Sequence, residues 1–273
     1  FSALNIDAQG RITGASSGLG KAMAQHLSAL NYRVFGTSRN PNKDSKTADF
    51  KLLQLDLTQP EQFKKLINKV MIKAGRIDVL INNAGLGITG PIEETDLAAM
   101  KSNFDTNFFG PLALSQIVLP QMRKQKSGLI INITSIGGYM GLPFRGIYSA
   151  SKGALSIATE ALRMEVKSQN INLVTLAPGD YATDIASRRH HSPLNESSPY
   201  YVTYKHSLDT INDHVDSGGN PLDVAKLVVK IIEGSQTHVH YKSGSFLQKF
   251  SIVLKKLLPD TLYEKLPMNH YKL

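Results

Sequence analysis

A tyrosine and a lysine stand four positions apart in the stretch YSASK, from Tyr148 to Lys152. On a helix this spacing puts both side chains on one face. A phenol beside an ammonium group can exchange protons with a reacting oxygen, because the positive charge favours tyrosinate and lowers a pKa that is ordinarily about 10. The same spacing occurs in YVTYK, from Tyr201 to Lys205. Spacing alone therefore does not say which pair does chemistry.

The residues that precede each pair distinguish the two. The apolar run GLIINIT predicts a buried strand, and Ser135 follows it at the carboxyl end. Tyr148 comes thirteen residues later and opens a strongly helical stretch, so its hydroxyl, the Lys152 ammonium and the Ser135 hydroxyl can converge on one crevice. The stretch NESSPY before the second pair contains no strand. We therefore assign catalysis to the first pair and expect Tyr201 and Lys205 to lie in an exposed loop or a short helix.

A glycine-rich stretch near the start of the chain has the composition of a phosphate-binding loop. It reads TGASSGLG, from Thr13 to Gly20, and the helical sequence KAMAQHLSAL follows it. Glycines permit close backbone approach, and the free N–H groups and positive dipole at a helix start can bind a pyrophosphate. The strand that should lead into the loop is weak, because NIDAQGRI is polar and contains Gly10. Either this strand is short and irregular, or these residues are not the natural ones.

Short apolar runs alternate with longer helical patterns along the chain. This alternation predicts parallel strands joined by right-handed crossovers. We expect one doubly wound α/β domain over residues 1–273, with its ligands at the carboxyl ends of the strands. The predicted strands are Tyr32–Ser38, Lys51–Leu57, Ile77–Asn82, Gly128–Thr134, Ile171–Leu176 and Thr237–Lys242, and the predicted helices lie near Leu19–Leu30, Pro60–Ala74, Ala98–Lys124, Tyr148–Ser168 and Pro221–Glu233.

Two segments do not follow this alternation. Asp180–Gly219 contains prolines, several tyrosines and no clear strand, and a long irregular insertion is usually functional or mobile. We expect it to form walls of a substrate pocket. Its His190 and His191 have no third ligand at suitable spacing, which favours a solvated loop over a metal site. The tail, residues 243–273, is amphipathic; packing on the domain or covering the pocket is the simpler interpretation, and association with a membrane surface is the alternative.

Composition excludes some classes of protein. The 273 residues include 41% hydrophobic and 19% charged side chains, as in ordinary globular proteins, and no apolar run approaches the roughly 18 residues of a membrane span. Cysteine is absent, which excludes disulfides and thiol catalysis and is compatible with a reducing compartment; we expect a cytoplasmic protein. The net charge of +9 is spread along the chain without a nucleic-acid motif, so we expect local binding of an anion and no nucleic-acid partner.

These motifs together resemble the short-chain dehydrogenase/reductase family, from about residue 12 to residue 240. Two features depart from the family pattern, namely the weak first strand and the pair Asp180-Tyr181, where the family more often has apolar residues. The matching motifs are, in the family's order, TGxxxGxG, LDL at Leu55–Leu57, NNAG at Asn82–Gly85, DTNFFG with Asn107, NITSIGG with Ser135, the pair Tyr148 and Lys152, and PGDYAT at Pro178–Thr183.

The resemblance implies a Rossmann fold, a homodimer or homotetramer, and hydride transfer between a nicotinamide cofactor and a carbonyl or alcohol. It implies that Tyr148 is the acid–base and that Lys152 also binds the nicotinamide ribose. Ser135 would hydrogen-bond the substrate oxygen, and Asn107 would hold a water that links Lys152 to solvent. A non-catalytic NADP-binding sensor on the same fold is the alternative, although a sensor has no need for all four residues.

The end of the second predicted strand bears on cofactor choice. Enzymes of this type that use NAD place an acid there to meet the ribose hydroxyls. This chain has Thr37, Ser38 and Arg39 instead, and a guanidinium with a hydroxyl suits a 2′-phosphate. We therefore predict NADP(H). The residues expected to bind it are Gly14, Ser16, Ser17, Gly18, Leu19, Gly20, Ser38, Arg39, Asp56, Leu57, Asn82, Ala84, Gly85, Tyr148, Lys152, Pro178, Gly179 and Thr183.

The substrate is less constrained by the sequence. The overall pattern resembles the hydroxysteroid and retinol dehydrogenase members of the family. That resemblance implies a lipophilic alcohol or ketone, by analogy of fold and motif only.

Overall fold

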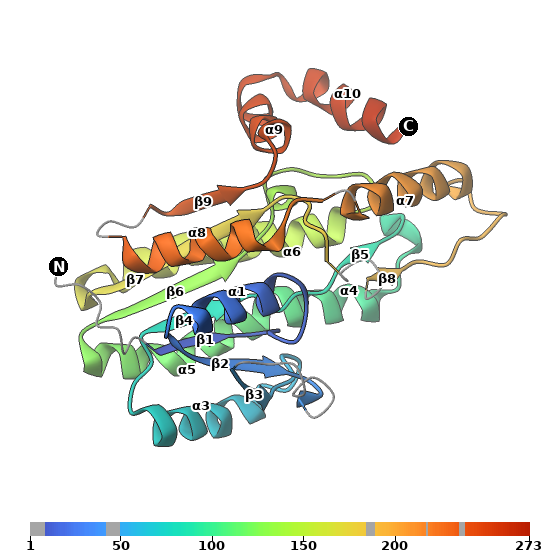
Figure 1. Ribbon diagram of the computed structural model, residues 1–273. Helices are drawn as coiled ribbons and strands as arrows, with labels where there is room; N and C mark the ends of the chain where they lie inside the picture. Colours follow the sequence, from blue (N-terminus) through green and yellow to red (C-terminus); the bar gives the residue numbers. More distant parts are fainter. Residues whose placement is uncertain (1–8, 42–49, 184–188, 217, 235–237) are drawn as a thin grey trace.

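The computed structural model describes residues 9–41, 50–183, 189–216, 218–234 and 238–273. Its centre is a parallel sheet of seven strands in the order β3-β2-β1-β4-β6-β7-β9 (Figure 1). The chain builds one half outward from β1 and the other half outward from β4, so a crevice opens at the carboxyl ends of these two strands. The predicted doubly wound α/β fold is confirmed. The strands are β1 (Gln9–Ile12), β2 (Arg33–Ser38), β3 (Lys51–Gln54), β4 (Val79–Asn82), β6 (Gly128–Ile133), β7 (Ile171–Pro178) and β9 (His240–Ser243).

Strand β1 forms despite its polar sequence. It is only four residues long and pairs with β2 on one side and β4 on the other, with Ile12 opposite Gly36 and Ile81. The two flanking strands supply its hydrogen bonds, and Ile12 is fully buried between the helices and the sheet. The described part of the strand is thus regular, whereas the earlier part of NIDAQGRI, residues 5–8, lies outside the described residues, so the expected shortness of the strand stays a prediction.

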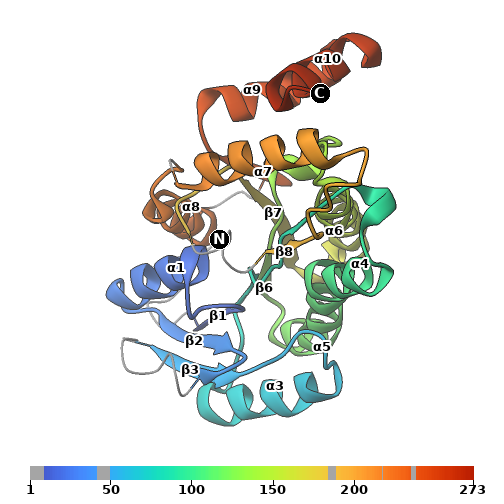
Figure 2. The same cartoon turned by 90° about the vertical axis from the view of Figure 1, so that its right-hand side faces the viewer.

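Helices cover both faces of the sheet (Figure 2). Helices α1 (Gly18–Ala29) and α8 (Pro221–Glu233) share one apolar core with the sheet, and α3 (Glu61–Ala74) and α5 (Gly110–Gln125) share the other. Strand β6 shows why, because its side chains alternate between the two cores: Leu129, Ile131 and Ile133 belong to the first and Ile130 to the second. This sandwich fixes the strand ends rigidly in space.

The predicted helix Ala98–Lys124 is interrupted. It consists of α4 (Leu97–Phe104), a π-helical turn (η3, Asp105–Phe109) and α5. Helical periodicity does not reveal one wide turn within an otherwise continuous helix, which is why the interruption was not predicted. Such turns recur at functional sites, and this one contains Asn107.

The expectation of an irregular segment without a strand at Asp180–Gly219 is wrong. His190–His191 form β8, which pairs in parallel with β5 (Ile88–Thr89). Tyr201–Asp216 form the sixteen-residue helix α7. The helix buries Tyr204, Leu208 and Ile211, spaced by four and three residues. This pattern is helical, but the nearby prolines and polar residues obscured it.

The C-terminal tail is helical, as predicted, but it is divided into two helices. Helix α9 (Phe246–Leu257) ends just before Pro259, and α10 (Asp260–Tyr271) begins after it. The two helices project from the body of the molecule beyond β9 (Figure 1). A small apolar cluster anchors them, in which Ile252 and Tyr263 pack against Ile136, Met140 and Ala177.

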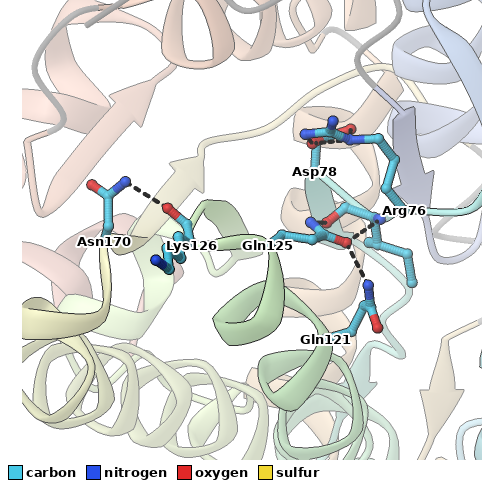
Figure 3. A network of polar contacts seen from close by, with 7 residues as sticks. Arg76, Asp78, Gln121, Gln125, Lys126 and Asn170 are labelled. Atoms are coloured by element: carbon cyan, nitrogen blue, oxygen red, sulfur yellow. Dashed lines mark hydrogen bonds and ion pairs between the residues drawn. The ribbon is translucent and has the colours of Figure 1, made fainter.

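Polar contacts close the opposite, amino-terminal edge of the sheet (Figure 3). The Gln125 amide accepts a hydrogen bond from the Ile77 N–H and donates one to the Ile77 carbonyl, at 3.0 and 2.9 Å. Arg76 pairs with Asp78 just before β4, and Asn170 donates to the Lys126 carbonyl just before β6. These contacts serve the backbone where strands begin, at the edge of the sheet away from the carboxyl ends.

The remaining described elements are helix α6 (Gly146–Glu165) and three short 3₁₀ helices, η2 (Ile92–Glu94), η4 (Ile136–Tyr139) and η5 (Lys167–Gln169).

Candidate active site

A cavity of ≈ 610 Å³ lies at the carboxyl ends of the strands, where the sheet order reverses. Loops that follow β1, β2, β4, β6 and β7 line it, together with the first turns of α1 and α6. Among the residues expected to bind the cofactor or the substrate, those on its wall are Gly14, Ser16, Ser17, Gly18, Leu19, Gly20, Ser38, Arg39, Asp56, Leu57, Ala84, Gly85, Ser135, Tyr148, Lys152, Pro178, Gly179 and Thr183.

The glycine loop has the shape of a phosphate cradle. Gly14 and Gly18 adopt φ of 63° and 51°, in the left-handed region that favours glycine. A Cβ atom on Gly20 would collide with the carbonyl oxygen of Gly14 and the amide of Asn83. Helix α1 starts at Gly18 with no acidic side chain in its first turn, so its positive end is not neutralised. The loop therefore fits the pyrophosphate of a dinucleotide, on the geometry of this chain alone.

The NNAG motif ties this loop to the end of β4. The hydroxyl of Thr13 accepts hydrogen bonds from the N–H groups of Asn83 and Ala84, at 2.8 and 2.9 Å. The Asn83 side chain donates to the Thr13 carbonyl at 2.9 Å. Asn82 points elsewhere: its side chain is buried and donates to Asn132 at 2.8 Å. The structure thus places Asn83, and not the predicted Asn82, on the cavity wall.

Ser135 and Tyr148 reach the cavity from different elements. Ser135 follows β6 directly, and its hydroxyl accepts a hydrogen bond from the Gly137 N–H at 3.1 Å, which starts the short helix η4. Tyr148 lies in the first turn of α6, which begins at Gly146. Both line the same cavity as Lys152, so the predicted convergence of these three side chains on one crevice is what the geometry shows.

Lys152 is the most buried charged group of the site. Its side chain is 4% exposed, and its ammonium donates to the Ile133 carbonyl at 2.9 Å. Burial lowers the pKa of Lys152 from 10.5 to about 8. The group therefore remains mainly a cation at neutral pH, but it gives up its proton more readily than an exposed lysine.

Asn107 lies behind the cavity wall rather than on it. Its amide oxygen accepts from the Leu86 N–H at 2.8 Å, and its nitrogen donates to the Leu86 carbonyl at 2.9 Å and to Ser151 at 3.1 Å. A Cβ on Gly85 would stand 3.2 Å from the Lys152 ammonium and 3.3 Å from the Asn107 oxygen. A larger residue at Gly85 would therefore crowd both groups, which would have to shift by a few tenths of an ångström. The role of Asn107 in holding a water stays a prediction.

The end of β2 carries the groups expected to select the cofactor. Ser38 and Arg39 line the cavity, and Arg39 is exposed. The Ser38 hydroxyl accepts a hydrogen bond from the Asn40 N–H at 3.2 Å. Asp56, after β3, also faces the cavity, but its carboxylate accepts from the N–H and hydroxyl of Thr58 at 2.9 and 2.8 Å. A cationic and a hydroxyl group thus stand together at the end of β2.

The second tyrosine–lysine pair does not reach the cavity. Tyr201 and Lys205 lie on α7 and are not among its lining residues. The Lys205 ammonium lies 5.8 Å from the centre of the Tyr201 ring, which is a surface cation–π contact. Lys205 is exposed, as expected. Nearby, the buried Tyr204 donates to the Thr89 carbonyl at 3.0 Å and holds α7 against β5.

Two arginines on the substrate side of the cavity were missed from the sequence. The Arg145 guanidinium lies over the Tyr148 ring at 5.5 Å, and Arg189 lines the same wall with Asp180. Burial and the charge of Arg145 lower the pKa of Arg189, and one Arg189 nitrogen, Nη1, is buried without a hydrogen-bond partner among the described residues. Arg145 directly precedes α6 and stands three residues before Tyr148, which was a usable signal, whereas nothing local marked Arg189.

The two histidines of the same segment lie on β8. His191 shares a hydrogen bond with the Thr89 hydroxyl at 2.9 Å. Over the residues that the structure describes, no group of three or more His, Asp or Glu could hold a metal ion. Both histidines are exposed, but they lie in a strand and not in the loop that was expected.

Known proteins resemble this chain over most of its length. The profile of the family described as short chain dehydrogenase matches residues 11–193. A 3-ketodihydrosphingosine reductase of Bacteroides thetaiotaomicron is 37% identical over 254 residues, covering 93% of this chain and 94% of the relative. Retinol dehydrogenase 8 of Bos taurus is 33% identical over 253 residues, covering 86% of this chain and 80% of the relative.

Solved structures share the fold along nearly the whole chain. A short-chain dehydrogenase from Streptomyces avermitilis gives a TM-score of 0.79 at 29% identity, covering 95% of this chain and 97% of that one. A Burkholderia phymatum family member in complex with NAD gives 0.75 at 25% identity, covering 87% and 90%. ElxO with NADP bound gives 0.69 at 28% identity, covering 87% and 96%. The chain belongs to the short-chain dehydrogenase/reductase family, whose members are oxidoreductases that act on CH–OH groups with a nicotinamide cofactor.

Proposed function

We propose that the protein is an NADP(H)-dependent oxidoreductase that interconverts a carbonyl with a secondary or primary alcohol, with Tyr148 as the acid–base. One observation supports this proposal more strongly than any other. Ser135, Tyr148 and Lys152 line the same cavity as the glycine loop at the start of α1. A proton donor and a dinucleotide cradle thus open on one space, as carbonyl reduction requires.

Each residue has a defined part in the proposed reaction. The bound nicotinamide supplies or accepts the hydride. Tyr148 delivers a proton to the developing alkoxide in reduction and removes it in oxidation. The buried Lys152 stabilises negative charge on the phenol, and Ser135 donates a hydrogen bond that orients the substrate oxygen. Asn107 fixes the turn of backbone at Leu86 beside Lys152.

The preference for NADP(H) rests on this chain's own residues, because similar structures hold either NAD or NADP. Arg39 and Ser38 stand at the end of β2, where an acid would repel the 2′-phosphate. A guanidinium can instead form charge-assisted hydrogen bonds with it. Their place on the cavity wall supports the proposal.

We propose a lipophilic alcohol or ketone as substrate, because the relatives named above are a retinol dehydrogenase and a 3-ketodihydrosphingosine reductase. The described wall of the cavity includes Leu86 and Ile88 but also Arg189 and Arg145, which lies over the Tyr148 ring. An apolar substrate with a polar group near its carbonyl would fit such a wall. A homodimer or homotetramer in the cytoplasm remains part of the proposal.

The experiment is a screen of NADPH oxidation against ketones and aldehydes of increasing chain length, steroid ketones and retinal, with NADH in parallel. We expect turnover with at least one lipophilic carbonyl and a preference for NADPH. Tight NADPH binding with no turnover on any carbonyl, and no NADP⁺ reduction with the matching alcohols, would favour the non-catalytic sensor. Turnover that prefers NADH would overturn the assignment of NADP(H) as cofactor but would leave the proposed oxidoreductase activity standing.

A further inference from the structure

Helix α9 presents an apolar stripe to solvent. The stripe consists of Phe246, Phe250, Val253 and Leu257, spaced by four, three and four residues, so that all four lie on one face. Phe246 is 74% exposed and Leu257 is 75% exposed, and Leu247 beside them is 75% exposed. The rings of Phe246 and Phe250 stack, with centroids 5.6 Å apart. A continuous exposed patch of this kind marks an interaction site more often than a single exposed leucine does.

The opposite face of α9 already has its packing partner. Ile252 is buried in the cluster that anchors the tail to Ile136, Met140 and Ala177. The side-chain nitrogen of Gln248 donates a hydrogen bond to the Asp180 carboxylate at 2.8 Å. Its side-chain oxygen accepts one from the Ser245 N–H at the start of the helix, at 3.1 Å. Packing of the tail on the domain explains why the inner face of α9 is apolar. It does not explain the apolar stripe on the outer face.

Lysines flank the stripe on one side. Lys249 and Lys256 are exposed and follow the stripe residues Phe246 and Val253 by three positions each. Residues 244–273 contain five lysines against Asp260 and Glu264, in a chain of net charge +9. An exposed apolar stripe bordered by lysines is the arrangement of a helix that lies in the surface of a membrane, where apolar side chains enter the acyl region and ammonium groups meet phosphates.

Charge favours a lipid surface over a second copy of the chain. Two copies that met through their stripes with antiparallel helices would place Lys249 and Lys256 of each on the same side of the contact, where like charges repel. An anionic lipid surface instead attracts the same lysines, by about 1 kcal/mol for each. No described helix is long and apolar enough to cross a bilayer.

We propose that the outer face of α9 binds the surface of an anionic phospholipid membrane. The inner face of the same helix contacts Asp180, which lines the cavity. Membrane binding would therefore bring the cavity close to the lipid, where an apolar substrate is concentrated. The binding itself does not depend on the proposed oxidoreductase activity.

The test is co-sedimentation of the full chain with vesicles. One set contains phosphatidylcholine alone, and the other contains equal parts of phosphatidylglycerol and phosphatidylcholine. We expect pelleting with the anionic set, weaker pelleting with the neutral set, and release by high salt. The double variant Phe246→Gln/Phe250→Gln should lose most binding. Ile72→Gln is the matched control, because Ile72 is 85% exposed on α3, away from the tail.

A second pair of variants separates charge from apolar contact. Lys249→Glu/Lys256→Glu should weaken binding to anionic vesicles by about 30-fold or more, since two lysine contacts are lost. Lys64→Glu/Lys65→Glu on α3 changes net charge equally and should bind as the parent does, because those lysines are exposed on another helix. Circular dichroism confirms that all variants fold.

Three results would overturn the proposal. The first is a parent chain that does not pellet with anionic vesicles. The second is binding that falls equally in the α9 and α3 charge variants, which would indicate attraction by net charge alone. The third is a parent that sediments as an oligomer, ignores vesicles and becomes monomeric in Phe246→Gln/Phe250→Gln, which would make the stripe a contact between copies.

Discussion

The chain contains two tyrosine–lysine pairs at the same spacing, and their surroundings differ in almost every respect. Lys152 is a buried residue of α6, and its ammonium donates a hydrogen bond to the Ile133 carbonyl at the carboxyl end of β6. Lys205 is exposed on α7, with its ammonium 5.8 Å from the centre of the Tyr201 ring. The first pair shares a cavity with Ser135, and the second pair borders none of it.

The difference shows that the strand behind a helix, and not the spacing on it, decides whether a pair reaches the cavity. Strand β6 ends where Ser135 and the Ile133 carbonyl can meet the first turns of α6. Helix α7 instead uses Tyr204 to hold β5, and its half-buried Tyr201 does not line the cavity. Burial shifts the pKa of Lys152 to about 8. Exchanging or removing matched residues of the two pairs therefore tests the assignment.

The largest effect is expected for Lys152→Ala. The change removes the charge that stabilises the phenolate and the group proposed to hold the nicotinamide ribose, so kcat/KM for NADPH-dependent turnover should fall by about 1,000-fold. Fluorescence titration should also show weaker NADPH binding. Lys205→Ala is the control and should leave both quantities as in the parent. Unchanged NADPH affinity in Lys152→Ala would mean that Lys152 does not reach the ribose.

A stability measurement distinguishes the same two lysines without any substrate. The pKa of Lys152 lies at about 8 in the folded chain, below the 10.5 of an unfolded lysine. Between these values the unfolded chain binds more protons, so stability of the parent rises with pH across that window. Lys152→Met removes the buried charge, so it should raise the free energy of unfolding by about 3 kcal/mol below pH 8.

That advantage of Lys152→Met should shrink as pH rises towards 10.5, because the parent lysine then loses its charge. Urea denaturation at several pH values measures it. Lys205→Met, at an exposed position, should change the free energy of unfolding little at any pH. A gain for Lys152→Met that grew with pH would contradict the burial of a charged ammonium.

A variant of Arg39, which lines the same cavity at the end of β2, tests the predicted preference for NADP(H). Arg39→Ala should lower kcat/KM for NADPH by roughly 10- to 150-fold, because a charge-assisted contact is worth about 1.5–3 kcal/mol, and it should change the NADH value little. Adding Ser38→Asp should reverse the preference. Steady-state kinetics with both cofactors measure this. Equal losses for NADPH and NADH would show that Arg39 acts on something they share, or on folding.

The fold and most of the site could be predicted because they depend on local patterns. Apolar runs mark the strands, and glycines at positions 14, 18 and 20 mark a loop that only glycine can form without collision. Ser135, Tyr148 and Lys152 were found because each sits at a strand end or on one helix face.

The features that were missed depend on contacts between distant segments. The π-helical turn at Asn107 becomes visible only with Leu86 and Ser151 beside it. Helix α7 is stabilised by Tyr204 against β5, and Arg189 reaches the cavity only because β8 pairs with β5. Asn82 and Asn83 are adjacent and chemically identical, so only the direction of each side chain separates a core amide from a cavity residue.

The most direct test compares Tyr148→Phe with Tyr201→Phe, measuring kcat and the NADPH dissociation constant of each. Tyr148→Phe removes only the proton donor, so kcat should fall by roughly 100- to 10,000-fold while NADPH binding stays near that of the parent. Tyr201→Phe should match the parent in both. Substantial turnover by Tyr148→Phe, or loss of turnover in Tyr201→Phe alone, would contradict the assignment of Tyr148 as the acid–base.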